Sequence, residues 1–420
     1  MSTTASPERA GPHRARTDKA PRRRRDLVLA CSGLELAGGG RTLLARLLAS
    51  ACASYADREG LRFSILSLTR HDAAYTPPAP TWYAAESRLA FASRVAGVQV
   101  LSQLARGGGR GSDGAGRTRP AFLFDLLGLG RIQSFLPKRI RSPFLLTLLG
   151  IEVWRPLRRS ERTALAKASI RLAISEITRR RSEPNLPAEA RACEVLHLAL
   201  EERPPAGEAD GKLLHDAGEG FLLIVGRMTA SEAYKGHDRL LDAMTLVGAC
   251  EDADPAPHLV VVGAREAADS SPHLVVAGDG DDSERLQRRA VELGLGDRVT
   301  FTGHVSEATL VELYRRCSMF VMPSRGEGFG LVYLEAMRAG KPCIAARGTA
   351  AEEIVLDGVT GLLVGADRSD ELARAIAKLL GDPETRSRLG AAGAERYRRQ
   401  FAYARFEEGL HRRLDRLTLL

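Results

Sequence analysis

The sequence predicts an α/β protein of two domains, each built on a parallel β-sheet with helices on both faces. Its 420 residues exceed the usual size of a single domain. In both halves, short apolar runs of strand length alternate with longer amphipathic segments, which is typical of strands joined by crossover helices. Between the halves, residues 201–220 are rich in Pro, Gly and acidic side chains and indicate a linker.

These observations divide the chain into four segments. Residues 1–25 are rich in Pro, Arg, Ser and Thr and lack apolar periodicity, so we expect a disordered basic tail. The first domain is predicted over residues 26–205 and the second over residues 206–399. A helix over about residues 400–420 is expected to pack back on the first domain.

The first domain opens with a strand at 27–31, a glycine-rich loop and a helix. Leu43, Leu44, Leu47 and Leu48 recur on one face of that helix. Further apolar runs predict strands at 63–68, 121–124, 144–149 and 171–175 and a helix at 87–104. Residues 107–116 contain six glycines and predict a surface insertion.

The second domain repeats the alternation from residue 221 onwards. Its strands are predicted at 221–225, 258–262, 299–302, 319–322 and 342–345, and its helices at 236–244, 283–293, 307–317, 330–339 and 370–380. Segment 257–263 nearly repeats as 272–278, although the sheet needs only one strand at this point. The second copy either adds an edge strand or replaces the first, and the sequence leaves both open.

The net charge of +9 is unevenly distributed along the chain. The tail carries +6, residues 26–210 carry +8 and residues 211–420 carry −5. Residues 101–181 alone carry +12. No aromatic platform or known nucleic-acid module accompanies this charge, so we expect no nucleic-acid partner. Basic residues beside apolar ones favour an anionic membrane surface or a phosphate-bearing acceptor, and a merely solvated surface is an equally good explanation.

The cysteines and apolar runs indicate the compartment. The six cysteines are isolated, and no Cys/His cluster has metal-ligand spacing, so we expect no metal site and a reducing environment. No apolar run approaches the roughly 18 residues of a membrane span, and no secretory signal is recognisable. We expect a cytoplasmic protein that can associate peripherally with the inner face of the membrane.

The glycine loop at 38–40 matches neither of two common phosphate-binding motifs, the P-loop and the pattern G-x-G-x-x-G. Gly39 and Gly40 stand where a P-loop needs Lys and Ser or Thr, and Leu43 replaces the third glycine of G-x-G-x-x-G. Glycines between a strand and a helix still let backbone N–H groups approach an anion. A plain tight turn explains them equally well.

The loop at 323–331 carries stronger signals, because it follows a buried strand and leads into a helix. Glu327 lies in this loop and Glu335 in the second turn of the helix. At the carboxyl end of a parallel strand the two carboxylates can flank one ligand, whereas elsewhere such a pair is usually solvated. Upstream, Arg227 and Lys235 are either surface charges or two cations suited to a diphosphate leaving group.

Five ordered blocks carry a family resemblance. They are Gly226-Arg227, Tyr234-Lys235-Gly236-His237-Asp238, Gly278-Asp279-Gly280, Phe301-Thr302-Gly303-His304-Val305, and Glu327-Gly328-Phe329-Gly330-Leu331 with Glu335. Together they resemble the donor half of the family 4 retaining glycosyltransferases. The resemblance implies the GT-B fold, in which two Rossmann-like domains with doubly wound parallel sheets face each other across a cleft. The first half matches more weakly, through loop 38–40, the block Gly150-Ile151-Glu152-Val153-Trp154 and the segment starting at Ser175.

The resemblance also implies that the protein binds a UDP- or GDP-linked sugar as its substrate. It implies neither a cofactor nor a metal ion. Arg227, Lys235 and Glu327 would form the catalytic set, with two cations on the diphosphate and a carboxylate at the donor sugar. The other donor-binding groups would be Glu335 on the ribose, the backbone of Phe329, Gly330 and Leu331 on the diphosphate, the backbone of Gly303 and Val305 at the base, and the loop glycines Gly39 and Gly40.

Two positions depart from the family pattern. Many relatives have His before the Gly-Ile-Glu-Val-Trp block, where this chain has Leu149, and Asp125 stands where another His is often found. A leucine side chain cannot donate a hydrogen bond to a sugar, so lower activity, compensation by another group and dependence on a partner all stay open.

The sequence predicts transfer of a sugar to a glycan or lipid-linked acceptor in polysaccharide or cell-envelope biosynthesis. A catalytically weak nucleotide-sugar-binding subunit or regulator is the alternative.

Overall fold

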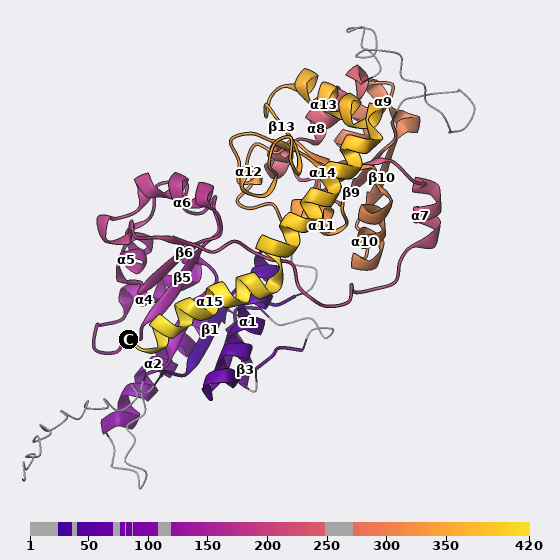
Figure 1. Ribbon diagram of the computed structural model, residues 1–420. Helices are drawn as coiled ribbons and strands as arrows, with labels where there is room; N and C mark the ends of the chain where they lie inside the picture. Colours follow the sequence, from indigo (N-terminus) through magenta and orange to yellow (C-terminus); the bar gives the residue numbers. More distant parts are fainter. Residues whose placement is uncertain are drawn as a thin grey trace, which may run out of the picture.

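The computed structural model describes residues 24–35, 40–69, 76–79, 81–85, 87–107, 119–247 and 272–420. Within these residues the chain forms two parallel sheets with helices packed on them, as the sequence predicts (Figure 1). Four predictions lie wholly or mainly outside the described residues: the basic tail, Gly39, the insertion at 107–116 and the strand at 258–262.

The first sheet has seven strands in the order β3-β2-β1-β4-β5-β6-β7, all paired in parallel. They are β1 (Leu27–Cys31), β2 (Phe63–Ser67), β3 (Thr81–Ala84), β4 (Ala121–Phe124), β5 (Phe144–Leu148), β6 (Ile170–Ala173) and β7 (Glu194–Val195). The associated helices are α1 (Gly40–Glu59), α2 (Arg88–Gly107), α3 (Leu127–Gly130), α4 (Ile132–Phe135), α5 (Arg159–Lys167), α6 (Glu176–Ser182) and the short 3₁₀ turns η2 (Glu183–Asn185) and η3 (Ala188–Ala190). Every residue of β1, β4 and β5 is buried, because the central strands of a parallel sheet are covered on both faces.

The strand predicted at 171–175 ends two residues early. The reason is that Ser175 caps α6, since its hydroxyl accepts a hydrogen bond from the backbone N–H of Thr178 at 3.0 Å. A serine whose oxygen satisfies an otherwise unpaired N–H of the first helical turn starts the helix at that position. The strand therefore stops at Ala173.

The second sheet has six parallel strands in the order β10-β9-β8-β11-β12-β13. They are β8 (Leu222–Val225), β9 (Leu274–Ala277), β10 (Val299–Gly303), β11 (Met319–Met322), β12 (Cys343–Ala346) and β13 (Gly361–Val364). The helical segments are α7 (Gly211–Ala217), η4 (Ala230–Lys235), α8 (His237–Leu246), α9 (Ser283–Glu292), η6 (Gly296–Arg298), α10 (Glu307–Arg316), α11 (Leu331–Arg338), α12 (Ala351–Ile354), α13 (Ser369–Gly381), α14 (Pro383–Arg396), the π-helical turn η7 (Tyr397–Phe401) and α15 (Tyr403–Thr418).

Two sequence predictions about the second sheet are refined by the structure. The second copy of the repeated segment forms β9, which pairs with both β8 and β10 and is therefore not an added edge strand. The predicted linker at 201–220 contains the helix α7, which begins after Asp210 because this side chain accepts the backbone N–H of Leu213 at 3.0 Å.

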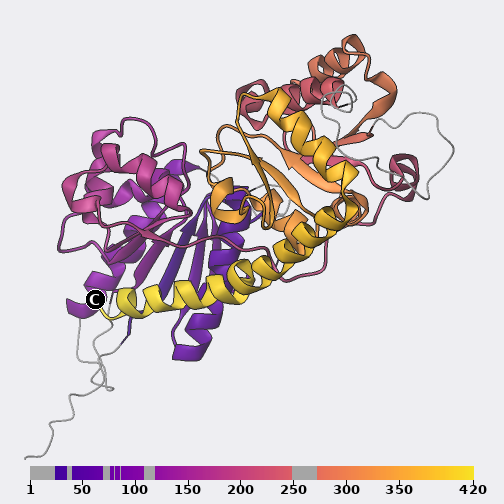
Figure 2. The same ribbon diagram turned by 45° about the horizontal axis from the view of Figure 1, so that its top comes forward.

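The helix α15 returns from the second sheet to the first and lies against α1 (Figures 1 and 2). Its contacts with α1 are polar as well as apolar. The hydroxyl of Tyr55 donates to Asp415 at 3.0 Å, and Nε2 of His411 lies 2.8 Å from the carbonyl oxygen of Ala51. This helix therefore ties the two halves of the chain together.

Candidate functional site

The candidate site lies at the carboxyl ends of the central strands of the second sheet. The strand β8 is flanked by β9 on one side and by β11 on the other, so the strand order reverses beside β8. The residues after β8 and after β11 belong to the predicted motifs. Ligands of doubly wound sheets bind at such a switch point, because the loops that leave the two strands diverge there.

Arg227 and Lys235 share one acidic partner at this point. Glu232, in η4, accepts a hydrogen bond from the Arg227 guanidinium through one oxygen, and its other oxygen lies 2.7 Å from Nζ of Lys235. The Arg227 side chain is 71% exposed, whereas that of Lys235 is 15% exposed. The structure thus brings the two predicted cations together. Lys235 is held in a mostly buried position, whereas the exposed side chain of Arg227 has room to reorient. Glu232 was missed from the sequence, although it stands three residues before Lys235.

Glu327 lies close enough to Lys235 for the lysine charge to act on its carboxyl. Burial raises the pKa of its carboxyl above the usual range, while the positive charge of Lys235 and a hydrogen bond from Ser324 lower it. The neighbouring loop is held by Tyr234, whose carbonyl oxygen accepts the backbone N–H of Arg325 at 2.8 Å. The residue before Lys235 therefore fixes the loop that carries Glu327.

The first backbone N–H groups at the N-terminus of α11 are not hydrogen-bonded within the described part of the protein. Gly330 caps this helix with a φ of 101°, and a Cβ at this position would lie 2.6 Å from the ring of Tyr333, so only glycine fits. Among the described residues, the backbone N–H groups of Phe329, Gly330 and Leu331 find no hydrogen-bond acceptor. Unpaired N–H groups at a helix N-terminus attract an anion.

The side chain of Phe329 is directed into the protein rather than to the site. It is buried, and its ring centroid lies 5.7 Å from that of His197 and 6.2 Å from that of Phe401. Only its backbone is therefore available for a ligand, which is the part that the resemblance implies.

Glu335 is anchored through one of its oxygens. Its Oε2 accepts a hydrogen bond from the buried hydroxyl of Tyr314 at 2.8 Å, which leaves Oε1 available. Burial raises the pKa of the carboxyl, while the Tyr314 hydrogen bond lowers it. Tyr314, in α10, was not singled out from the sequence because it is far from Glu335 along the chain.

Gly303 and Val305 lie at the end of β10, two strands away from β8. The carbonyl oxygen of Gly303 accepts the backbone N–H of Gly278 at 3.0 Å, so this turn is attached to the neighbouring loop. Val305 is partly buried against the main apolar core. Among the described residues, no hydrogen bond joins Gly303 or Val305 to Arg227 or Lys235.

The first half of the chain meets the donor-side loop at Gly328. The Ser175 hydroxyl donates to the carbonyl oxygen of Gly328 at 2.7 Å, and a Cβ on Gly328 would lie 2.6 Å from the carbonyl oxygen of Leu149. Gly40 is the first residue of α1, and a Cβ there would lie 3.6 Å from Cδ1 of Leu331. The starts of α1 and α11 are therefore neighbours, whereas Gly39 lies outside the described residues.

A second contact between the halves is centred on Glu353. Its carboxylate accepts the backbone N–H groups of Glu176 and Ile177, both at 2.7 Å, and lies 2.8 Å from Nε2 of His197. Burial raises the pKa of Glu353, but the hydrogen bonds from His197 and the two N–H groups outweigh it and lower the pKa. No local motif marks this residue, so the sequence did not indicate it.

The two positions that depart from the family pattern have different surroundings. Leu149 donates its backbone N–H to Oε1 of Glu152 at 2.5 Å. Asp125 is buried, and its Oδ2 accepts both the backbone N–H of Ser32 at 2.8 Å and the Ser32 hydroxyl at 2.7 Å. Its Oδ1 has no partner among the described residues, and burial raises the pKa of the carboxyl to about 6.

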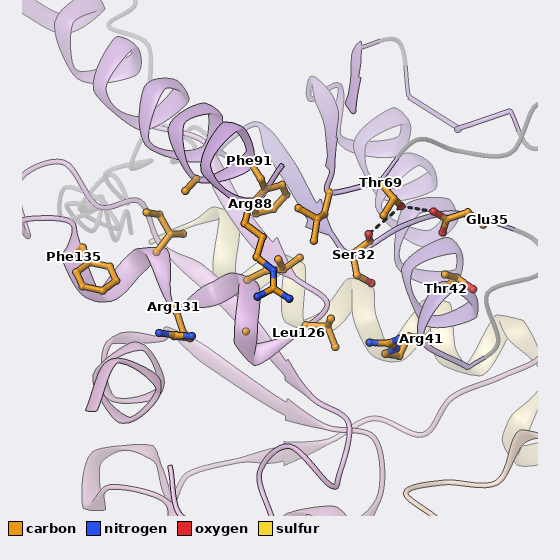
Figure 3. A pocket seen from close by; sticks show the side chains of 15 residues that line it. Ser32, Glu35, Arg41, Thr42, Thr69, Arg88, Phe91, Leu126, Arg131 and Phe135 are labelled. Atoms are coloured by element: carbon orange, nitrogen blue, oxygen red, sulfur yellow. Dashed lines mark hydrogen bonds between the residues drawn. The ribbon is translucent and has the colours of Figure 1, made fainter. Parts of the chain in front are cut away.

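A cavity of about 590 Å³ opens in the first half, beside Ser32 (Figure 3). It is lined by residues that follow β1, β2 and β4 and by the helices α1 to α4. None of the residues that line this cavity was singled out from the sequence.

Within the described residues, no group of three His, Cys, Asp or Glu side chains is placed to hold a metal ion. No helix of the described part combines the length and apolar character needed to cross a membrane.

Solved structures contain the same arrangement of two parallel-sheet domains. The Anabaena protein Alr3699/HepE in complex with UDP-glucose aligns with a TM-score of 0.67 and 19% identity, over 94% of this chain and 100% of that chain. A likeness at this identity defines the fold. The protein therefore has the GT-B fold, as the resemblance implies.

Sequence comparison finds a family match in the second half of the chain. Residues 207–396 match the family described as glycosyl transferases group 1. D-inositol 3-phosphate glycosyltransferase of Thermomonospora curvata is 36% identical over 185 residues, which cover 44% of this chain and 39% of that protein. GDP-mannose-dependent alpha-(1-6)-phosphatidylinositol monomannoside mannosyltransferase of Mycolicibacterium smegmatis is 38% identical over 117 residues, covering 26% of this chain and 31% of the relative. The chain thus matches less than half the length of these two relatives, and the predicted family resemblance is confirmed.

Proposed function

We propose that this protein is a retaining glycosyltransferase that moves a sugar from a nucleoside-diphosphate sugar to a glycan or lipid-linked acceptor, in polysaccharide or cell-envelope biosynthesis. The observation that carries the proposal is the convergence of Arg227, Lys235 and the unpaired start of α11 at the switch point of the second sheet. The names of the matched relatives, which include a GDP-mannose-dependent enzyme, and the UDP-glucose bound to the structural neighbour support it.

The chemistry follows from the charge that develops on the leaving group. When the bond between the sugar and the diphosphate breaks, negative charge accumulates on the diphosphate, and fixed donors aimed at it lower the barrier. Lys235 and the N–H groups at the start of α11 would supply this stabilisation, and Arg227 would turn from Glu232 to the ligand. A front-face substitution of this kind retains the anomeric configuration and needs neither a protein nucleophile nor a metal.

The two carboxylates would position the donor rather than attack it. Glu335 has one oxygen held by Tyr314 and one available to accept hydrogen bonds from ribose hydroxyls. Glu327 would accept a hydrogen bond from the donor sugar. The Lys235 charge favours its ionised form, against the burial that raises its pKa.

The proposal is tested by a screen of UDP- and GDP-linked sugars for hydrolysis or transfer. Wild type is expected to turn over at least one donor, and Lys235→Ala and Glu335→Ala are expected to lose at least about tenfold in kcat/KM, because each removes a charged contact to the donor. Lys378→Ala, which changes an exposed lysine on α13, serves as the control. Absence of both turnover and nucleoside-diphosphate binding in wild type would contradict the proposal.

A second candidate function is a nucleotide-sugar-binding subunit or regulator with little activity of its own. Leu149 favours it, because a side chain without a hydrogen-bond donor replaces a histidine that contacts the sugar in many relatives. Binding of a nucleoside diphosphate without turnover of any donor would favour this second function. Turnover that Leu149→His increases would favour the enzyme.

We also propose a cytoplasmic protein that associates with an anionic membrane surface. Its support is the concentration of positive charge in residues 101–181 and the exposed apolar side chain of Phe135 in the same stretch. Sedimentation with phosphatidylcholine vesicles that contain phosphatidylglycerol is expected to carry the protein down at low salt and less so at high salt. Equal sedimentation with pure phosphatidylcholine vesicles would contradict it.

A further inference from the structure

The cavity in the first half lies beside the proposed donor site. Arg41 and Thr42 line it, and they directly follow Gly40, which faces Leu331 at the start of α11. Its volume of about 590 Å³ is in the range of small-molecule sites. None of the residues proposed to bind the donor lines this cavity. The ligand that it would bind is therefore a separate question from the donor.

Three arginines from three different elements line this cavity. Arg41 lies in the first turn of α1, Arg88 is the first residue of α2, and Arg131 stands between α3 and α4. Figure 3 shows the Arg88 side chain extending from α2 into the middle of the cavity, with Arg41 to one side and Arg131 to the other. Their guanidinium groups therefore surround a common space.

Two of these three cations make no direct contact with a charged group among the described residues. Neither Arg41 nor Arg88 forms an ion pair or a hydrogen bond there, although the charge of Arg41 acts on the buried Asp125. Arg131 donates only through Nε, to the hydroxyl of Ser160 at 2.9 Å. Among the described residues of the lining, Glu35 is the one carboxylate, and it accepts a hydrogen bond from Thr69. This described part of the lining thus holds three positive charges and one negative charge.

The start of α1 adds to this positive field. The helix has 20 residues and no acidic side chain in its first turn, so its N-terminal partial charge is not offset locally. Asp125 lies behind Ser32, with its pKa raised by burial, and Arg41 is among the groups that lower that pKa. The described side chains that line the cavity therefore carry a net positive charge.

Much of the remaining wall is apolar, beside the hydroxyl side chains of Ser32, Thr42 and Thr69. The apolar part consists of Leu68, Phe91, Ala92, Leu126, Leu129, Ile132 and Phe135. Phe135 is 70% exposed, which is unusual for a side chain of this size and extends the apolar wall to solvent. A fully hydrophilic glycan would cover this wall poorly and would leave Arg41 and Arg88 unpaired.

We propose that this cavity binds the acceptor through a phosphate group, which Arg41, Arg88 and Arg131 hold, while an apolar part of the acceptor lies along Phe91, Ile132 and Phe135. The inference rests on the proposed function, because it names the class of acceptor for that reaction. Guanidinium groups suit phosphate oxygens, since each can donate two parallel hydrogen bonds. The phosphate belongs either to a soluble phosphate ester or to a lipid headgroup.

The first arm of the test uses a soluble phosphate ester. Binding of glucose 6-phosphate and of glucose is measured by calorimetry with the donor site filled by saturating UDP or GDP. Wild type is expected to bind only the phosphate ester. Arg88→Ala and the double variant Arg41→Ala/Arg88→Ala are expected to weaken it by at least about tenfold. Arg162→Ala, which removes an exposed arginine of α5 outside the cavity, is expected to leave the affinity unchanged.

The second arm uses a lipid headgroup. Sedimentation is compared with phosphatidylcholine vesicles that do or do not contain phosphatidic acid, for wild type and the same variants. Losses in Arg88→Ala that are absent in Arg162→Ala assign the phosphate to a lipid, whereas a response in the first arm alone assigns it to a soluble ester. Both results support the inference. It is overturned if glucose binds as well as its phosphate, if neither probe binds, or if Arg162→Ala weakens binding as much as Arg88→Ala.

The two proposals fail in different ways. If phosphate esters bind in an Arg88-dependent manner but no nucleoside diphosphate binds, the proposed function is lost and the anion site stands. If nucleoside diphosphates bind through Lys235 but the phosphate probes do not respond to Arg88, the acceptor class is wrong and the donor site stands. Melting temperatures of the Arg41, Arg88 and Arg162 variants, which change exposed side chains, are expected to equal that of wild type.

Discussion

At the scale of single residues, the predicted charged groups are held by polar partners, some of them close along the chain and some distant along it. Lys235 and Arg227 share Glu232, Glu335 is held by Tyr314, and Asp125 is held by Ser32. Among the described residues, Glu335 and Asp125 each keep one carboxyl oxygen without a hydrogen-bond partner, and the two cations share a single carboxylate. Such partly satisfied charged groups at strand ends are typical of ligand sites, because the remaining hydrogen-bonding capacity has to be met by the ligand.

Asp125 is expected to make stability depend on pH. Its pKa is raised from 3.8 to about 6 in the folded protein, so the folded state binds the proton more tightly than the unfolded state. The associated stability is fully present below pH 3.8 and is lost as pH rises through about 6. Relative to Asp125→Asn, wild type should lose about 1.4 kcal/mol between pH 5 and pH 7.5.

Urea unfolding of both proteins at the two pH values measures this difference. The variant keeps an oxygen that accepts the Ser32 hydrogen bonds but cannot ionise, so it isolates the titration of one carboxyl. A difference that stays constant from pH 5 to pH 7.5 would mean that Asp125 does not titrate in this range.

At the scale of elements, the donor-side loop is shaped by close approaches that require glycine. Gly330 has a positive φ and lies against Tyr333, while Gly328 lies against the backbone of Leu149. The loop therefore presents its N–H groups only if the start of α11 keeps its conformation. This connects the backbone of one short segment to the binding of the diphosphate.

Gly330→Ala is expected to cost more stability than Gly340→Ala, by about 1–3 kcal/mol. Both glycines have a positive φ and flank the same helix, but a Cβ at Gly340 meets nothing within 4 Å, whereas one at Gly330 lies 2.6 Å from the Tyr333 ring. Gly330→Ala is also expected to weaken nucleoside-diphosphate binding. Thermal unfolding and calorimetry check both effects, and equal behaviour of the two variants would contradict the assigned role of Gly330.

The strands could be predicted from the sequence where all of their side chains are buried. β4 and β11 occur at the predicted residues, because every side chain in them is apolar and buried. β3 and β7 were not predicted, since one is an edge strand beside prolines and the other has two residues. Within the site, the motif residues of the second half were predicted from their order. The partners Tyr314 and Glu353 were not, because they lie far along the chain from the residues that they contact, and Glu232 was missed although it stands three residues before Lys235.

At the scale of the whole molecule, the two halves meet through a few specific polar contacts. Glu353 joins the second half to the start of α6 and to His197, and Ser175 joins the first half to Gly328. These contacts lie beside the start of α11. The spacing between the halves and the geometry of the proposed donor site are therefore coupled.

Glu353→Ala is expected to loosen this connection. The change removes three hydrogen bonds between the halves, so we expect a loss of about 2 kcal/mol in unfolding free energy and a larger radius of gyration in small-angle X-ray scattering. Glu352→Ala is the control, because the neighbouring Glu352 accepts only the N–H of Gly348 in its own half. An unchanged radius of gyration in Glu353→Ala would show that other contacts fix the halves.

The central claim is that the second half binds a nucleoside diphosphate through Arg227, Lys235 and the start of α11. Calorimetry with UDP and with GDP, on wild type, Arg227→Ala, Lys235→Ala and the control Lys378→Ala, tests it most directly. We predict binding of at least one nucleotide by wild type and the control, and a loss of at least about tenfold in both site variants. Equal affinity in all four proteins, or no binding by wild type, would contradict the claim.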